Sequence, residues 1–210
     1  MIKVFVIGDH PIFREGLKQI LCETSDIAVK DEASFREEAL KKVSKNLFDV
    51  VILHTYFSGK WGLDFLKKLK TIKPKLPVLI LNMRAEEDYG LRYLKSGASG
   101  CLAKECELDE LKRAIRELAK GKKYISPSLA EKIAFNLITG KEEANHNALS
   151  NREYQVMCMI AAGKTPKEIA EELSLSVKTI STVRARIMKK MKWKGNVELT
   201  HYAIKHELVD

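Results

Sequence analysis

Short apolar runs and longer amphipathic stretches alternate along the first half of the chain. Five runs rich in β-branched residues predict strands, at Ile2–Ile7, Ile27–Val29, Val50–Leu53, Val78–Leu81 and Cys101–Ala103. Stretches with helical periodicity lie between and after them, at Ile12–Cys22, Phe35–Lys45, Leu63–Lys70, Glu86–Lys95 and Leu108–Lys120. This alternation predicts βαβ units, and therefore a doubly wound parallel sheet with helices on both faces.

The pattern changes beyond Gly121, where only helical signals remain. Pro127 can begin one helix that ends before Gly140, and the residues that follow are polar as far as Asn147. Four further helices are predicted, at Asn151–Ala161, Pro166–Leu173, Val177–Met191 and Asn196–His206. We therefore expect an α/β domain, a linker with one helix and an all-α domain, at 1–121, 122–147 and 148–210.

Two of the late helices are joined by a very short turn. Thr165, Pro166 and Glu168 offer an N-cap, a proline at the first helical position and the acid of a capping box. Ser176 can cap the next helix, and only Ser174–Ser176 separates the two. This arrangement predicts a helix-turn-helix whose second helix is free to enter a major groove.

The second of these helices carries concentrated positive charge. Seven basic residues and no acid lie between Ser176 and Gly195. Its apolar residues recur at helical spacing, at Ile180, Val183, Ile187 and Met191. They share one face of the helix, and the opposite face is cationic and polar. A solvated face usually mixes both signs, so the segment indicates contact with DNA. The net charge of +9 likewise favours a polyanionic partner.

Composition argues against several other classes. No apolar run approaches the roughly 18 residues that span a bilayer, and Met1–Ile7 is too short for a signal peptide, so we expect a cytoplasmic protein. No disulfide or metal site is expected, because no C-x-x-C pair or neighbouring histidine accompanies Cys22, Cys101, Cys106 and Cys158. No nucleophile, base and oxyanion set is visible, so we expect neither an enzyme nor a cofactor.

Dispersed motif positions mark the last domain, namely Leu149-Ser150-Asn151-Arg152-Glu153, Ala162-Gly163-Lys164, Lys167-Glu168-Ile169-Ala170, Leu173, Ser176 and Lys178-Thr179-Ile180. Together they resemble the DNA-binding domain of LuxR-type regulators. One departure is Val183, where the family often has histidine. The resemblance implies that Val177–Met191 is the recognition helix. It also implies a sequence-specific transcriptional regulator that binds double-stranded DNA.

The resemblance further implies roles for single residues. Base edges would be read by Lys178, Ser181, Thr182 and Ala185. Phosphates would be contacted by Lys164, Thr165, Lys167, Arg184, Arg186, Lys189 and Lys192, although for any one of these lysines or arginines a merely solvated side chain is an equal alternative. A homodimer would pair through the last helix and read an inverted repeat, using Val197, Leu199, Tyr202 and Ala203. Alternatively, these apolar residues close the core of the monomer.

A second set of motif positions lies in the first domain, namely Asp9-His10-Pro11, Arg14-Glu15-Gly16-Leu17, Asp49-Val50-Val51, Gly62-Leu63, Gly97-Ala98 and Lys104. They resemble the receiver domain of NarL/FixJ response regulators. The resemblance implies a five-stranded parallel sheet in the order 2-1-3-4-5. It also implies a DNA-binding output governed by phosphorylation of the receiver.

The first domain departs from the receiver pattern at the phosphorylation site. His54 stands where the family has its acceptor aspartate, and Gly8 replaces one of two adjacent acids. Asn82 replaces a Thr or Ser, and Cys101 replaces an aromatic residue, so only Asp9 and Lys104 remain. Without the carboxylate no acyl phosphate can form, and Asp9 alone is a poor ligand set for Mg²⁺. We therefore expect a regulator that acts without aspartyl phosphorylation.

Several roles for this degenerate site stay open. His54 could hydrogen-bond Asp9, accept a phosphoryl group itself, or titrate near neutral pH as a sensor. Trp61 could cover the pocket. The receiver could serve as a dimerisation module or bind a protein partner. In the alternative to a DNA-binding function, the chain is an interaction protein that titrates a kinase or another regulator.

Overall fold

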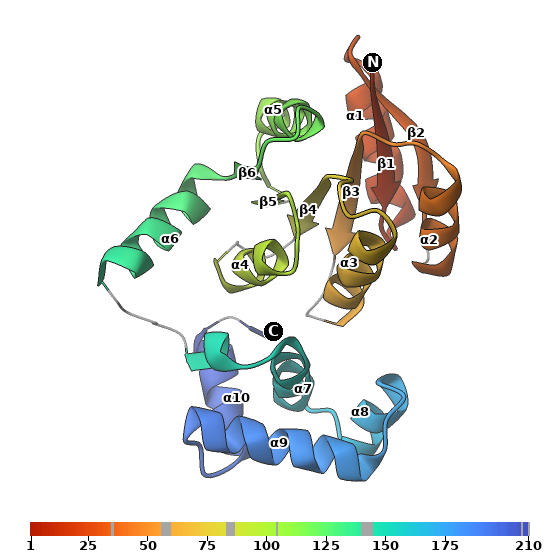
Figure 1. Ribbon diagram of the computed structural model, residues 1–210. Helices are drawn as coiled ribbons and strands as arrows, with labels where there is room; N and C mark the ends of the chain where they lie inside the picture. Colours follow the sequence, from red (N-terminus) through yellow and green to blue (C-terminus); the bar gives the residue numbers. More distant parts are fainter. Residues whose placement is uncertain are drawn as a thin grey trace. The chain divides into compact units, whose positions relative to one another are not determined.

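The apolar runs of the first half of the chain pair into one parallel sheet (Figure 1). The computed structural model describes residues 1–34, 36–55, 60–82, 87–103, 105–139, 145–206 and 208–209. The chain divides into two units, one drawn from Met1–Phe57 and Trp61–Phe135 and the other mainly from Asn136–Asp210. None of the described helices is both long and apolar enough to cross a membrane.

The sheet has six strands, one more than we expected. They are β1 Ile2–Ile7, β2 Ile27–Ala33, β3 Val50–Thr55, β4 Val78–Asn82, β5 Gly100–Ala103 and β6 Tyr124–Ile125, in the order β2-β1-β3-β4-β5-β6. The added strand has two residues, too few for a periodic signal, and it pairs with β5 at Gly100. A Cβ atom at Gly100 would lie 2.7 Å from the Tyr124 carbonyl oxygen, so the close approach of β6 requires glycine there.

Helices cover both faces of the sheet, at α1 Pro11–Cys22, α2 Arg36–Lys45, α3 Lys60–Ile72, α4 Glu87–Lys95 and α5 Leu108–Ala119. On one face, Leu17 and Leu21 of α1 and Ile115 of α5 form a core with alternate strand residues such as Val4 and Ile52. The intervening strand residues point to the opposite face and are also fully buried. The apolar runs are therefore strands buried in the sheet, and the amphipathic stretches are helices that cover its faces.

The first unit extends past the boundary expected at 121. The helix α6, Pro127–Thr139, begins directly after β6, and the Leu129 N–H donates to Ser126 Oγ (3.3 Å). Leu129 is buried, and a Cβ atom added at Gly90 of α4 would lie 3.0 Å from its side chain. The start of the segment that we expected to be a linker thus packs onto the sheet domain.

The second unit is helical, with a short 3-10 helix η1, Asn145–Ala148, followed by α7 Asn151–Ala161, α8 Pro166–Glu172, α9 Val177–Met191 and α10 Asn196–Lys205 (Figure 1). Ser150 and Thr165 each close a capping box, and Ser176 caps α9. Ser174 adopts a left-handed conformation, with φ of 51°, in the short turn between α8 and α9. The inward face of α9 is buried at Ile180, Val183, Ile187 and Met191, as the periodicity predicts.

Candidate nucleic-acid interface and receiver site

The outer face of α9 presents the four residues for which base contacts were expected. Lys178, Ser181, Thr182 and Ala185 are all exposed. The Ser181 hydroxyl donates to the Val177 carbonyl, and the Thr182 hydroxyl donates to the Lys178 carbonyl, both at 3.0 Å. These bonds use the hydroxyl protons but leave the oxygen lone pairs open to solvent. The face can therefore offer one ammonium group, two acceptor oxygens and the methyl groups of Thr182 and Ala185 to base edges.

The amino-terminal end of α9 is suited to an anion. Ser176 Oγ accepts a hydrogen bond from the Thr179 N–H (3.0 Å), and the first turn carries no acidic residue. The partial positive charge of the helix terminus is therefore not neutralised by a nearby carboxylate on α9.

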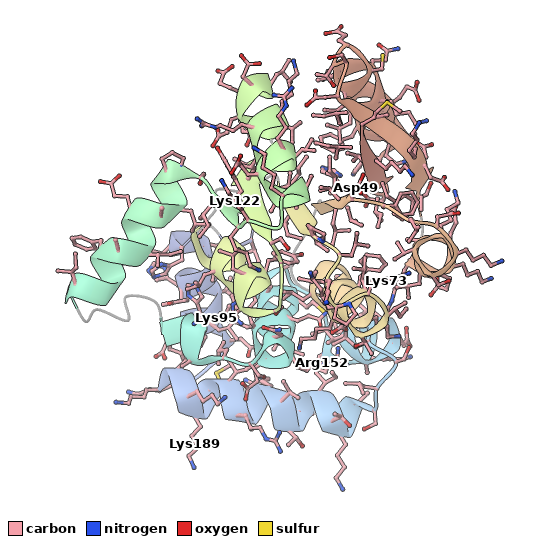
Figure 2. The ribbon with its side chains drawn as sticks, turned by 45° about the horizontal axis from the view of Figure 1, so that its top comes forward. Asp49, Lys73, Lys95, Lys122, Arg152 and Lys189 are labelled. Atoms are coloured by element: carbon pink, nitrogen blue, oxygen red, sulfur yellow. The ribbon has the colours of Figure 1, made fainter. Side chains whose placement is uncertain are left out.

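The seven residues with expected phosphate contacts fall into two groups. Lys167, Arg186, Lys189 and Lys192 are exposed, and Lys189 projects from α9 (Figure 2). The others already have partners in the chain: Lys164 pairs with Glu172, Arg184 Nε donates to Asn196 Oδ1 (2.8 Å), and Thr165 caps α8. A phosphate would have to compete with those partners, so the first group should contribute more to DNA affinity.

The structure corrects part of the expected dimer surface. Leu199 and Ala203 are fully buried within the monomer, since they share the face of α10 that turns towards the core. Tyr202 is half-buried, and its hydroxyl lies 2.8 Å from His146 Nδ1. Val197 is 84% exposed and Ile204 is 56% exposed. Of the four expected residues, only Val197 is fully available to a second copy.

His54, for which the resemblance implies the acceptor position, is packed inside the protein. His54 lies near the carboxyl end of β3, opposite Leu81 of β4, and is 1% exposed. Its ring stacks on Phe13 of α1, with ring centroids 3.8 Å apart. Asp9 is exposed, and its carboxylate lies 3.7 Å from His10 Nε2.

Gly8 and His54 are sterically matched. A Cβ atom at Gly8 would lie 3.0 Å from His54 Cβ and 3.3 Å from its Nδ1. His54 therefore crowds the position of a side chain at residue 8, first through its own Cβ atom and then through its imidazole.

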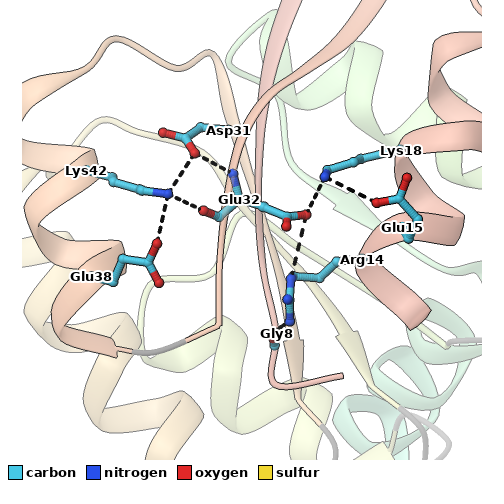
Figure 3. A network of polar contacts seen from close by, with 8 residues as sticks. All are labelled: Gly8, Arg14, Glu15, Lys18, Asp31, Glu32, Glu38 and Lys42. Carbon is cyan, nitrogen blue, oxygen red and sulfur yellow. Dashed lines mark hydrogen bonds and ion pairs between the residues drawn. The ribbon is translucent and has the colours of Figure 1, made fainter. Parts of the chain in front are cut away.

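A buried arginine fixes the backbone at this point. Arg14 Nη1 donates to the Gly8 carbonyl (2.6 Å), while Arg14 Nε lies 3.7 Å from the Glu32 carboxylate (Figure 3). Lys18 pairs with the same carboxylate at 2.9 Å. This chain of charges links the end of β1 to α1 and β2, so Gly8 cannot easily move away from His54.

The other expected site residues lie elsewhere or outside the described part. The Cys101 thiol is buried, and a Cβ atom added at Gly90 would lie 3.4 Å from its sulfur. Asn82 ends β4, but its side chain is outside the described residues, as are the side chain of Trp61 and all of Lys104. The structure therefore brings together Gly8 and His54, while the carboxylate of Asp9 lies near His10.

Two family models match the chain. The response regulator receiver domain matches residues 4–116, and the luxR family of bacterial regulatory proteins matches residues 147–203. The chain is a response regulator.

Relatives of known name agree with this assignment over the full length. The response regulator is 35% identical to response regulator UvrY of Escherichia coli, over 99% of this chain and 96% of that protein. It is 34% identical to response regulator GacA of Pseudomonas protegens, over 100% of this chain and 99% of that protein. The fold resembles RcsB of Salmonella enterica serovar Typhimurium, solved bound to the promoter rprA, with a TM-score of 0.73 at 23% identity, covering 96% and 97% of the two chains.

Sequence reasoning missed an ion pair between a buried carboxylate and an exposed lysine in the second unit of this response regulator. Lys190 Nζ donates to Glu153 Oε2 (2.7 Å), and Glu153 also accepts from the Ser150 N–H (2.8 Å). Burial raises the pKa of the Glu153 carboxyl, but the hydrogen bonds from Lys190 and Ser150 outweigh it and bring the pKa below its usual value of 4.5. Lys190 is thus a structural residue among the basic residues of α9.

Glu153→Gln should lower the free energy of unfolding of the second unit by about 1–3 kcal/mol at neutral pH, because the buried carboxylate that accepts the charged hydrogen bond loses its charge. The folded-state pKa is lowered, so this stabilisation is present above pH 4.5 and disappears as the pH falls through the folded-state pKa. Denaturant titrations at several pH values test this. The exposed Glu171→Gln on α8 is the control, and an equal effect of both substitutions would contradict the assignment.

Proposed function

We propose that this response regulator is a sequence-specific, DNA-binding transcriptional regulator that acts without aspartyl phosphorylation. Its homologues are DNA-binding response regulators with a luxR-type domain. The packing of His54 beside Gly8 supports regulation without aspartyl phosphorylation. An imidazole stands where the acceptor carboxylate would be, and its Nδ1 atom would lie 3.3 Å from a Cβ atom at position 8, so a second acid there would be crowded.

Magnesium does not fit the residues of this site. The ion requires several hard oxygen ligands in near-octahedral geometry. Gly8 supplies no ligand, and His54 supplies nitrogen atoms on a ring that is stacked against Phe13. Among the side chains that are described here, only Asp9 offers a carboxylate, and phosphoryl transfer depends on metal or other positive charge near the leaving oxygens. We therefore derive no phosphorylation step.

The DNA-binding part rests on the geometry of α9. Exposed polar groups at Lys178, Ser181 and Thr182 lie on the side opposite to its buried core residues. Exposed basic side chains at Lys167, Arg186 and Lys189 would hold phosphates and position the helix in the major groove. The RcsB structure of similar fold is bound to a promoter, which agrees with this assignment.

The proposal includes a homodimer on an inverted repeat. Val197 and Ile204 are seven residues apart and therefore share one face of α10. Both are exposed, so they can pair with the same face of a second copy around a two-fold axis. Each protomer would then place its α9 in a half-site about one helical turn from the other.

Binding to fragmented genomic DNA tests the proposal. The unmodified full-length protein should recover a limited set of specific sites that share an inverted repeat, without any phosphodonor. Recovery of only nonspecific DNA, with an affinity that vanishes near physiological salt, would contradict it. That outcome would favour the alternative of an interaction protein that titrates a kinase or another regulator.

A further inference from the structure

Lysines from three loops gather at the amino-terminal edge of the sheet. Parallel strands all begin at this edge, so the loops after α3, α4 and α5 converge there. The lysines are Lys70, Lys73, Lys75, Lys95, Lys120, Lys122 and Lys123. Figure 2 labels one from each loop, Lys73, Lys95 and Lys122. We call this set the edge lysines.

One hydrogen bond and one close approach show that the three segments meet. Lys70 Nζ donates to the Leu76 carbonyl (2.7 Å), and Lys123 Nζ donates to the Ala98 carbonyl (3.1 Å). A Cβ atom at Gly97 would lie 3.5 Å from the Lys70 side chain. Burial lowers the pKa of Lys70, and the positive charge of Lys123 lowers it further. Two ammonium groups therefore repel each other at this edge.

Few acids balance this charge. Glu117 pairs with Lys120 (2.8 Å) and Lys122 (2.7 Å), whose hydrogen bonds lower the pKa of its carboxyl to about 2. Asp49 Oδ2 accepts from the backbone N–H of Lys3 (2.7 Å). Within the described part of the chain, no ion pair with a carboxylate forms at Lys70, Lys73, Lys75, Lys95 and Lys123. The edge therefore keeps a positive charge that an anionic partner can neutralise.

An apolar groove lies beside the edge lysines. It has a volume of about 590 Å³ and runs between the loops before β3 and β4 and the end of α5. Leu47 lines it and is 80% exposed, and Ile72 is also exposed. Phe48, Pro74, Leu76 and Pro77 add to its apolar lining, and its charged lining residues are Lys73, Lys75 and Asp49. Exposed apolar residues that gather in a groove with a charged rim are typical of a protein-binding surface.

We propose that the edge lysines and this groove bind an acidic segment of another protein that also carries apolar side chains. Carboxylates of the segment pair with Lys73, Lys75 and Lys123, and its apolar side chains cover Leu47 and Ile72. A nucleic acid would satisfy the lysines through its phosphates but would leave the apolar groove uncovered. The charge complementarity would steer the encounter, so the association rate should fall as salt is added.

A labelled short peptide of Glu, Asp, Leu and Phe is a suitable probe for the full-length protein, with affinity measured by fluorescence anisotropy. The double substitution Lys73→Glu and Lys75→Glu should weaken binding at least about tenfold, because both attractive charges become repulsive. Leu47→Ser should weaken it several-fold through loss of apolar contact. Matched controls are Lys30→Glu on β2 and Ile12→Ser on α1, both exposed and outside the groove, and neither should change the affinity.

Three outcomes would overturn the proposal. One is equal binding of the peptide by the protein and its lysine double variant. Another is binding of an all-glutamate peptide as tightly as the mixed one, which would make the groove irrelevant. The third is a single-stranded DNA oligonucleotide that loses affinity in the lysine variant but not in Leu47→Ser, which would assign the edge to nucleic acid. None of these readouts depends on specific DNA recognition by α9, so this proposal and the proposed function can fail separately.

Discussion

Gly8→Asp is expected to lower the free energy of unfolding of the receiver unit by about 2–5 kcal/mol, although it restores an acid that receivers normally carry. The new Cβ atom would lie 3.0 Å from His54 Cβ, and overpacking of this kind costs about 1–3 kcal/mol. A carboxylate in the same buried position adds the cost of an unsatisfied polar group. Arg14 holds the Gly8 carbonyl at 2.6 Å, so the backbone cannot easily yield. Denaturant titration measures the change.

A double-mutant cycle isolates the steric part of this effect. Gly8→Ala should destabilise the wild type but cost less in a His54→Gly background, which removes the Cβ atom as well as the imidazole, giving a coupling energy of about 1–2 kcal/mol. Gly16→Ala is the matched control, because a Cβ atom there meets nothing within 4 Å and alanine favours the α1 helix. Equal costs of Gly8→Ala in both backgrounds would show that His54 does not fill the space beside Gly8.

Lys178→Ala is expected to weaken binding to the protein's specific DNA site by about 1–3 kcal/mol, or roughly 5- to 150-fold, and to relax base preference at one position. Lys178 is exposed at the start of α9, where a recognition helix contacts base edges. Affinities of wild type and variant for the preferred site and for single-base variants of it test this.

Lys189→Ala is the matched control for the base-reading role, since Lys189 is also exposed on α9 but lies near its carboxyl end. It should weaken all sequences about equally and reduce the salt slope by about one. If Lys178→Ala left both affinity and base preference unchanged, the assignment of Lys178 to base reading would be wrong.

The periodicity of apolar residues predicted the helices and their buried faces, but it did not predict what packs against each buried face. The inward spacing of Ile180, Val183, Ile187 and Met191 correctly identified the buried face of α9. The same kind of signal on α10 could not distinguish a core from a dimer surface, and Leu199 and Ala203 proved to belong to the core. An apolar stripe shows that a face is buried but does not show what buries it.

The sequence pattern did not predict the shortest strand or the packing between side chains of separate elements. The strand β6 has two residues, and its pairing depends on the missing side chain of Gly100 rather than on any pattern of its own. The substitutions at Gly8 and His54 were visible as departures from a family pattern. Their steric match depends on contacts between separate elements, including the stacking of His54 on Phe13. Such contacts need the three-dimensional fold.

We propose that DNA recognition by this response regulator is not switched by aspartyl phosphorylation. The most direct test measures the affinity of the full-length protein for its preferred site before and after incubation with a small-molecule phosphodonor, with intact mass determined on the same samples. We predict no added phosphoryl mass and no change in affinity. A phosphoryl adduct accompanied by a several-fold rise in site affinity would contradict the account, whether the adduct were on His54 or on another residue.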